Sequence, residues 1–199
     1  WDAVAVVPQD LGLVDELSVA ENVLLPLWLA GRLDGGRAEV ATLLERLGLG
    51  PEPMLAANPK LVYGRVTGWG QTGPLAQAAG HDINYVSLTG AMAIAGRLGQ
   101  APMVPATLLG DMAGGAMFLL FGLLCAVREA ERSGLGQVVD AAMVDGVAAL
   151  SSLVHQRRGL GSWLDEPAQN FFLGSAHFYD TFECANGRCI SLGAIEPKF

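Results

Sequence analysis

The sequence predicts an α/β fold, because strand-like and helix-like segments alternate along most of the chain. Short apolar runs rich in β-branched residues are separated by longer runs in which apolar residues recur at helical spacing. Glycine and proline clusters mark the connections between them. In order, we expect a strand at 60–67, a helix at 83–93, a helix at 112–132, a strand at 137–140 and a helix at 141–157.

Toward the end of the chain the pattern changes to alternating aromatic and β-branched residues. Two such segments, 178–184 and 188–192, are joined by Asn186-Gly187. An Asn-Gly pair between alternating segments is typical of a β-hairpin turn. We therefore expect a smaller α+β domain to begin at residue 161.

Composition limits the function classes. A chain of 199 residues that is 51% hydrophobic and 16% charged can bury a real core, in one domain or parts of two. The net charge of −8 and the absence of a Lys/Arg run argue against a nucleic-acid partner. The longest apolar segment, 112–127, is shorter than the roughly 20 residues of a membrane span. We expect a buried helix there and no membrane partner.

The cysteines and the first residue bear on the cellular setting. Cys125, Cys184 and Cys189 do not suggest a disulfide framework, although the last two flank the hairpin turn and could face each other across it. We interpret all three as reduced thiols in a cytoplasmic protein.

Because the chain starts at Trp1, without a methionine, we expect it to be a fragment. No metal-ligand spacing such as CxxC or HExxH occurs, so no metal is expected.

The most informative motif is Gly80 to Tyr85, which reads GHDINY, together with Asp111 in LLGDMAGG. His81 lies where a glycine-rich loop ends and a helix is expected to begin, and the peptide N–H groups of a helix start suit an anionic oxygen. Asp111 opens the next long helix, where it could act as an N-cap alone. An imidazole and a carboxylate on separate loops are what a two-base proton transfer at carbon requires.

Residues 1–44 carry their own pattern. The segments VVPQD, LSVAENVLLPLWLAGR and RAEVATLLERLGL resemble the Q-loop region of ABC transporter ATP-binding subunits, in which Gln9 would be the Q-loop glutamine. No GxxxxGK[ST] loop precedes them, so no nucleotide site and no ATPase activity are expected. The function that this resemblance still allows is that of a binding or regulatory fragment related to transporter ATPases.

Residues 45–199 resemble the family III CoA-transferase superfamily and, within it, the alpha-methylacyl-CoA racemases. The resemblance rests on GRVTGWGQTGPLAQAAGHDINYVSLTGA, LLGDMAGGAMF, SGLGQVVDAAMVDG and HFYDTFECANGRCISLGAIEPKF. It implies part of a Rossmann-like large domain at 45–160 and the start of the smaller domain at 161–199. A fusion, a recombination product or an assembly error would each leave this junction with residues 1–44.

The resemblance also implies roles for individual residues. His81 and Asp111 would exchange the α-proton of a 2-methyl-branched acyl-CoA thioester through an enolate, and Glu196 would orient and charge the histidine. On spacing alone, Glu196 is an ordinary turn carboxylate. Residues that would line the substrate and its CoA are Gly80, Asp82, Ile83, Asn84, Tyr85 and, with a weaker signal, Arg65. The CoA belongs to the substrate, so no cofactor is expected, and the family implies an interlocked homodimer.

Two further alternatives stay open. In a CoA-transferase of the same superfamily, the residue at the position of Asp111 is a nucleophile that forms a mixed anhydride and then an enzyme thioester. His81 favours the racemase, because those transferases generally lack a histidine there. The second alternative is an inactive fragment, because the N-terminal part of the large domain, which the racemases use to recognise CoA, is replaced here.

Overall fold

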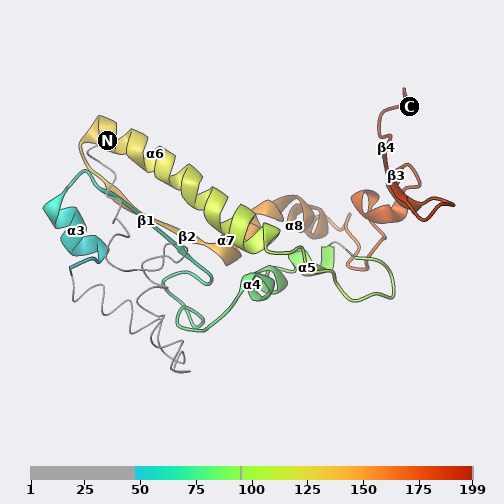
Figure 1. Ribbon diagram of the computed structural model, residues 1–199, viewed down its shortest axis with the longest axis horizontal. Helices are drawn as coiled ribbons and strands as arrows, with labels where there is room; N and C mark the ends of the chain where they lie inside the picture. Colours follow the sequence, from blue (N-terminus) through green and yellow to red (C-terminus); the bar gives the residue numbers. More distant parts are fainter. Residues whose placement is uncertain (1–47, 95, 199) are drawn as a thin grey trace. The chain divides into compact units, whose positions relative to one another are not determined.

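The structure is a computed structural model that describes residues 48–94 and 96–198; the predicted segment 1–44 lies outside them. Helices and strands alternate along the described chain, which confirms the α/β class (Figure 1). The elements are α3 (Pro51–Ala57), β1 (Val62–Thr67), α4 (Asp82–Leu88), α5 (Ala91–Ile94), the π-helix η1 (Leu108–Met117), α6 (Phe118–Ser133), β2 (Gln137–Ala142), α7 (Met143–Leu150), α8 (Ser152–Gly159), the π-helix η2 (Phe171–Ser175), β3 (Tyr179–Glu183) and β4 (Cys189–Gly193).

The chain divides into two compact units. Of the described residues, 48–79 and Met117–Ala141 form the first, and those within 80–116 and 142–198 form the second. The first unit holds α3, β1, α6 and most of β2. The second holds the remaining elements, including the whole GHDINY motif. This division follows the packing within the chain, and the predicted domain boundary at residue 161 stays a prediction.

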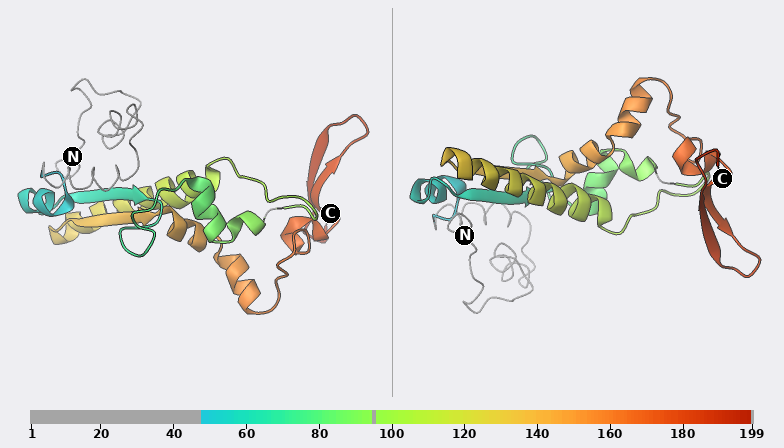
Figure 2. Two further views of the ribbon diagram at one scale, coloured as in Figure 1. Left: turned by 90° about the horizontal axis from the view of Figure 1, so that it is seen from below. Right: turned by 90° about the horizontal axis from the view of Figure 1, so that it is seen from above.

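In the first unit, β1 and β2 form a two-stranded sheet. Hydrogen bonds join the strand starts to each other and the later parts to each other, as in strands that run in the same direction. Near the strand starts, the Gly136 N–H donates to the Pro59 carbonyl at 2.6 Å. Farther along both strands, the Thr67 hydroxyl donates to the Asp140 carboxylate at 3.4 Å. Helix α6 lies along these strands in each view (Figures 1 and 2).

Glycines allow α6 to approach this sheet closely. A Cβ added to Gly64 of β1 would lie 2.7 Å from Leu123 of α6, and one added to Gly122 of α6 would lie 2.7 Å from Val139 of β2. Both distances are too short for real side chains, so the missing Cβ atoms set the spacing between helix and sheet. The helix ends where Gly134 takes up a left-handed conformation at φ 78°.

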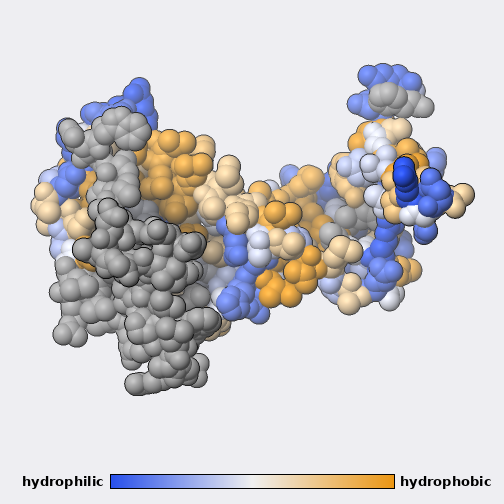
Figure 3. All heavy atoms as spheres, in the orientation of Figure 1, coloured by the Kyte–Doolittle hydropathy of each residue, from blue (hydrophilic) through white to orange (hydrophobic). Residues whose placement is uncertain are grey.

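The prediction that the apolar segment 112–127 forms a buried helix is wrong for the described chain. A two-stranded sheet covers only one face of α6, where Ala126 and Ala130 are buried. Figure 3 shows apolar atoms along this helix. The stretch Leu108–Ser133 is long and apolar enough to cross a membrane by length and composition only, and 17% of its most apolar window is buried. Its exposed large apolar residues are Leu108, Met112, Met117, Phe118, Leu120, Phe121 and Leu124.

Two predicted helices are each interrupted. The helix expected at 83–93 forms as α4 and α5, because Gly90 between them adopts φ 81°, outside helical geometry. The helix expected at 141–157 forms as α7 and α8, which meet at Ser151. The periodicity of apolar residues continues through both breaks. It therefore predicted correctly that these segments are helical, but it did not predict where the helices are interrupted.

The predicted hairpin is confirmed. Strands β3 and β4 are antiparallel, with Thr181 opposite Ser191, and Gly187 in the turn has φ 76°. Cys189 lies opposite Glu183 in this register, so it does not face Cys184 directly.

The core of the second unit joins α4 to α7. Val86 of α4 and Val147 of α7 are fully buried, and Ala91 of α5 packs with them. The glycine pair Gly114 and Gly146 brings η1 against α7, since a Cβ on Gly146 would overlap the Gly114 carbonyl oxygen. Gly114 therefore serves the close packing of η1 on α7. The same core therefore packs against both the start of α4 and the start of η1.

Candidate active site

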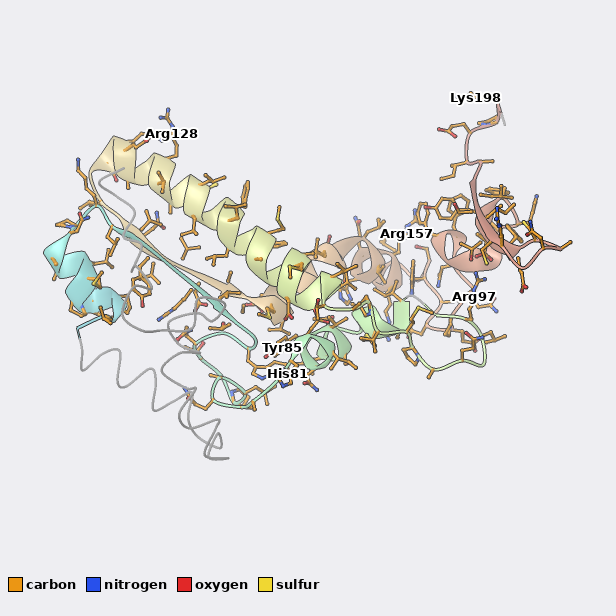
Figure 4. All side chains as sticks on the ribbon, viewed as in Figure 1. His81, Tyr85, Arg97, Arg128, Arg157 and Lys198 are labelled. Atoms are coloured by element: carbon orange, nitrogen blue, oxygen red, sulfur yellow. The ribbon has the colours of Figure 1, made fainter. Side chains whose placement is uncertain are left out.

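His81 is the residue immediately before α4, in an extended conformation (φ −132°, ψ 171°). Its N–H donates to the Asn84 side chain at 3.0 Å, and its carbonyl accepts the Asn84 N–H at 2.8 Å. This reciprocal pairing fixes where the helix begins. His81 itself is exposed, so its imidazole is open to a ligand (Figure 4). The local arrangement agrees with the prediction that His81 lies at a helix start.

Asp82, the first residue of α4, reaches across to η1. Its side chain is buried, with 5% exposure. Its Oδ2 accepts the N–H of Gly110 at 2.7 Å and the N–H of Asp111 at 2.8 Å. The first turn of a helix has N–H groups without intrahelical partners, and Asp82 supplies an acceptor for two of them. This explains why helical structure begins with η1 at Leu108 and not at Met112, where the helix 112–132 was predicted to start.

Asp111 lies within the first turns of η1, and the prediction that it could cap the helix start is wrong. The Met112 N–H bonds the Thr107 carbonyl at 3.2 Å, the wide i to i−5 spacing of a π-helix. Such π-helical segments occur often at functional sites. Asp111 is partly buried.

The electrostatics of the site favour the protonated form of Asp111 more than in an isolated carboxyl group. Its pKa is raised above the ordinary value, mainly by burial and further by the negative charge of Asp82. His81 acts in the opposite direction and lowers the pKa. These effects require both side chains to lie within electrostatic range of Asp111. His81, Asp82 and Asp111 therefore lie in one region of the second unit, and the two-base role of His81 and Asp111 stays a prediction.

We expect Asp111→Asn to stabilise the fold at neutral pH. Because the folded-state pKa of Asp111 is raised, the stability that this carboxyl contributes is present below its unfolded pKa and is lost as pH rises through the folded value. The variant should therefore melt at a higher temperature than the parent at pH 7, and the difference should disappear in acid. Thermal denaturation between pH 4 and pH 8 measures this, with exposed Asp145→Asn as the control.

The other residues of the motif have different surroundings. Gly80 is buried, Tyr85 is buried at 3% exposure, and Ile83 is 40% exposed. Asn84 is exposed but holds the helix start by accepting the His81 N–H. Sequence reasoning placed Asp82 among residues that line the substrate; the structure instead directs its Oδ2 to the backbone of η1. No local rule predicts such a bond between residues 28 positions apart.

Two predicted site residues are not joined to this pair. Glu196 follows β4 and is exposed, and in the described part of the chain no hydrogen bond or ion pair links it to His81 or Asp111. Arg65 lies on β1 in the first unit, where its Nε is 3.6 Å from the Asp140 carboxylate on β2. Their roles stay predictions.

A hollow of about 680 Å³ lies elsewhere in the second unit, between the loop after α5 and the β3–β4 hairpin. Its lining includes Met103, Tyr179 and Leu192 but neither His81 nor Asp111. The cation in its lining, Arg97, is bound by Asp180 at 2.7 and 2.8 Å. The predicted His81/Asp111 pair therefore lies outside the lining of this hollow.

Comparison with known proteins bears on the identity of this site. The family model described as CoA-transferase family III matches residues 38–199. An alpha-methylacyl-CoA racemase of Mus musculus is 45% identical over 157 residues, which are 79% of this chain and 41% of that protein. A CaiB/baiF CoA-transferase family protein of Caenorhabditis elegans is 34% identical over 195 residues, 96% of this chain and 54% of that protein.

A solved structure agrees. The crystal structure of a CAIB/BAIF family protein from Brucella suis superposes with a TM-score of 0.62 at 25% identity, over 72% of this chain and 38% of that one. The chain thus spans about two fifths to one half of the length of these relatives. The alignment with the worm protein reaches well into residues 1–44, because it covers 96% of the chain. The resemblance of residues 1–44 to ABC transporter subunits is not shown and stays a prediction.

Proposed function

Because the chain belongs to CoA-transferase family III, we propose that it is part of a racemase that epimerises 2-methyl-branched acyl-CoA thioesters. The observation that carries the proposal is that Asp82, the residue directly after His81, accepts the Asp111 N–H at 2.8 Å and so holds Asp111 near the helix start that carries His81. The 45% identity to an alpha-methylacyl-CoA racemase over 79% of the chain supports it.

The mechanism follows from the weak acidity of a proton next to a thioester. Removing it requires hydrogen-bond donors already placed for the enolate oxygen. We propose that peptide N–H groups in the first turn of α4, beside His81, supply them. His81 takes the proton from one face of the carbon while protonated Asp111 returns one on the other face. The raised pKa of Asp111 supports its part as donor. The reverse direction exchanges the two roles.

Further expectations are part of this proposal. The acyl-CoA brings its own CoA, so the reaction needs no cofactor and no metal, and Glu196 assists His81 when the substrate is bound. The protein is cytoplasmic and forms an interlocked homodimer.

We keep the ABC-like origin of residues 1–44 as a proposal too. Sequencing independent DNA across codons 40–50 distinguishes a fusion from an assembly artefact. The size of the purified chain in solution tests the dimer.

Incubation in deuterium oxide tests the function. The purified chain is mixed with a single epimer of a 2-methylacyl-CoA, and NMR follows the α-proton and the opposite epimer. We expect loss of the α-proton signal together with formation of the second epimer. Transfer of CoA to an added carboxylate without exchange would support the transferase alternative, in which Asp111 is a nucleophile. A chain that does neither would support the alternative of an inactive fragment.

A further inference from the structure

The carboxylate of Asp82 is unusual for a buried group. Its side chain is 5% exposed, and its Oδ2 receives two backbone N–H bonds at 2.7 and 2.8 Å. Its Oδ1 is buried and has no hydrogen-bond partner within the described residues. None of the ion pairs of that part of the chain includes Asp82. A buried charge that is only half satisfied costs free energy, so packing alone does not account for it.

The backbone of Gly110 packs closely against this carboxylate. A Cβ added to Gly110 would lie 2.5 Å from the Asp82 Oδ2 and 2.9 Å from its Cγ. Gly110 is itself buried. The absence of a side chain at Gly110 is what allows the carboxylate to reach both N–H groups.

The connection made by Asp82 is short and rigid. Asp82 follows His81 directly in the chain, and its carboxylate holds the backbone of Asp111. The path from one proton-carrying residue to the other therefore consists of one peptide bond and one hydrogen bond. A displacement of about 1 Å between reacting groups can cost on the order of 10²-fold in rate. We infer that Asp82 is a positioning residue, which holds Asp111 at the helix start that carries His81; this rests on the proposed function.

The charge of Asp82 adds a second effect to its position. A negative charge next to Asp111 favours the protonated carboxyl, in agreement with the raised pKa of Asp111. The groups that face Asp111 from α4 are Asp82 and His81. On α7, which packs against η1, Asp145 is the titratable side chain, and it is exposed. Asp82 is therefore the anion through which this site adjusts Asp111.

Two substitutions separate position from charge. Asp82→Asn keeps an oxygen that accepts the same N–H bonds but removes the charge, and Asp82→Ala removes both. For α-proton exchange, we expect Asp82→Ala to lower kcat by about 10²-fold with little change in KM. Asp82→Asn should retain most of the activity at its own optimum, with the pH limb that belongs to Asp111 moved to lower pH. Gly110→Ala, which displaces the carboxylate, should resemble Asp82→Ala.

A titration without turnover keeps this inference separate from the proposed function. Carboxyl ¹³C NMR follows Asp111, whose signal is assigned by its loss in Asp111→Asn. We expect the pKa of Asp111 to be lower in Asp82→Asn than in the parent, whether or not the chain exchanges α-protons. An Asp111 titration that is unchanged in both Asp82→Asn and Asp82→Ala would overturn the inference and leave Asp82 as a helix cap. Failure of exchange in the parent chain would instead count against the proposed function.

Discussion

Racemisation of a 2-methylacyl-CoA should be lost in both His81→Ala and Asp111→Asn. Each substitution removes one of the two groups that exchange protons with the α-carbon, and general acid–base groups typically contribute about 10²–10⁴-fold. Both residues take part in the same proton transfer, so the racemisation rate of the double variant should be little lower than that of either single variant. Interconversion of purified epimers, followed by NMR in deuterium oxide, measures all three rates.

Separate epimers make this test sharper. His81→Ala should abolish exchange from the epimer whose proton His81 faces, while Asp111→Asn should abolish exchange from the opposite epimer. His155→Ala is the matched control, because His155 is an exposed histidine on α8 and should leave both rates unchanged. Equal loss of exchange from one epimer in both variants would contradict a two-base mechanism. Retention of racemisation in either variant would remove that residue from the mechanism.

The parts of the fold that depend on local sequence were predicted well. Residues 62–67 form the expected strand, and the Asn186-Gly187 turn joins the expected hairpin. Both signals are short-range: β-branched residues suit an extended chain, and an Asn-Gly pair suits the left-handed geometry of a tight turn. The start of α4 at Asp82 was predicted within one residue because the reciprocal bonds of His81 and Asn84 are local as well.

The site could be predicted only in part, because its central bond is not local. His81 and Asp111 were recognised as a pair from their types and settings. That Asp82 joins them could not be inferred, since an aspartate in the first turn of a helix is ordinarily explained by the helix dipole. The one available signal was Gly110, the glycine directly before Asp111. The need for glycine at this position becomes clear only from the structure, in which a Cβ added to Gly110 would lie 2.5 Å from the Asp82 Oδ2.

The burial of the apolar helix was predicted wrongly for a related reason. Composition identifies an apolar helix but does not identify what covers it. Here one face of α6 packs on β1 and β2, while Phe121 is 70% exposed and Leu124 is 63% exposed. The apolar composition of this segment therefore does not by itself predict its burial.

Gly146→Ala should destabilise the fold, because it inserts a side chain between two closely packed helices. Gly146 lies in α7, and its missing Cβ would be 2.7 Å from the Gly114 Cα and would overlap the Gly114 carbonyl oxygen. Backbone cannot rotate away as a side chain can, so α7 and η1 must separate. Overpacking of this kind costs about 1–3 kcal/mol. A loss of about 2 kcal/mol should lower Tm by roughly 4–8 °C in a chain of this size, measured by circular dichroism.

A matched glycine separates this packing effect from helix propensity. Gly159, the last residue of α8, has no atom within 4 Å of an added Cβ, so Gly159→Ala should leave Tm unchanged or raise it slightly. Because η1 also carries Asp111, separation of η1 from α7 in Gly146→Ala should move the Asp111 titration toward its ordinary value, whereas Gly159→Ala should not. Equal Tm changes in the two variants would mean that α7 and η1 are not closely packed in solution, and the support for Asp111 would have to come from Asp82 alone.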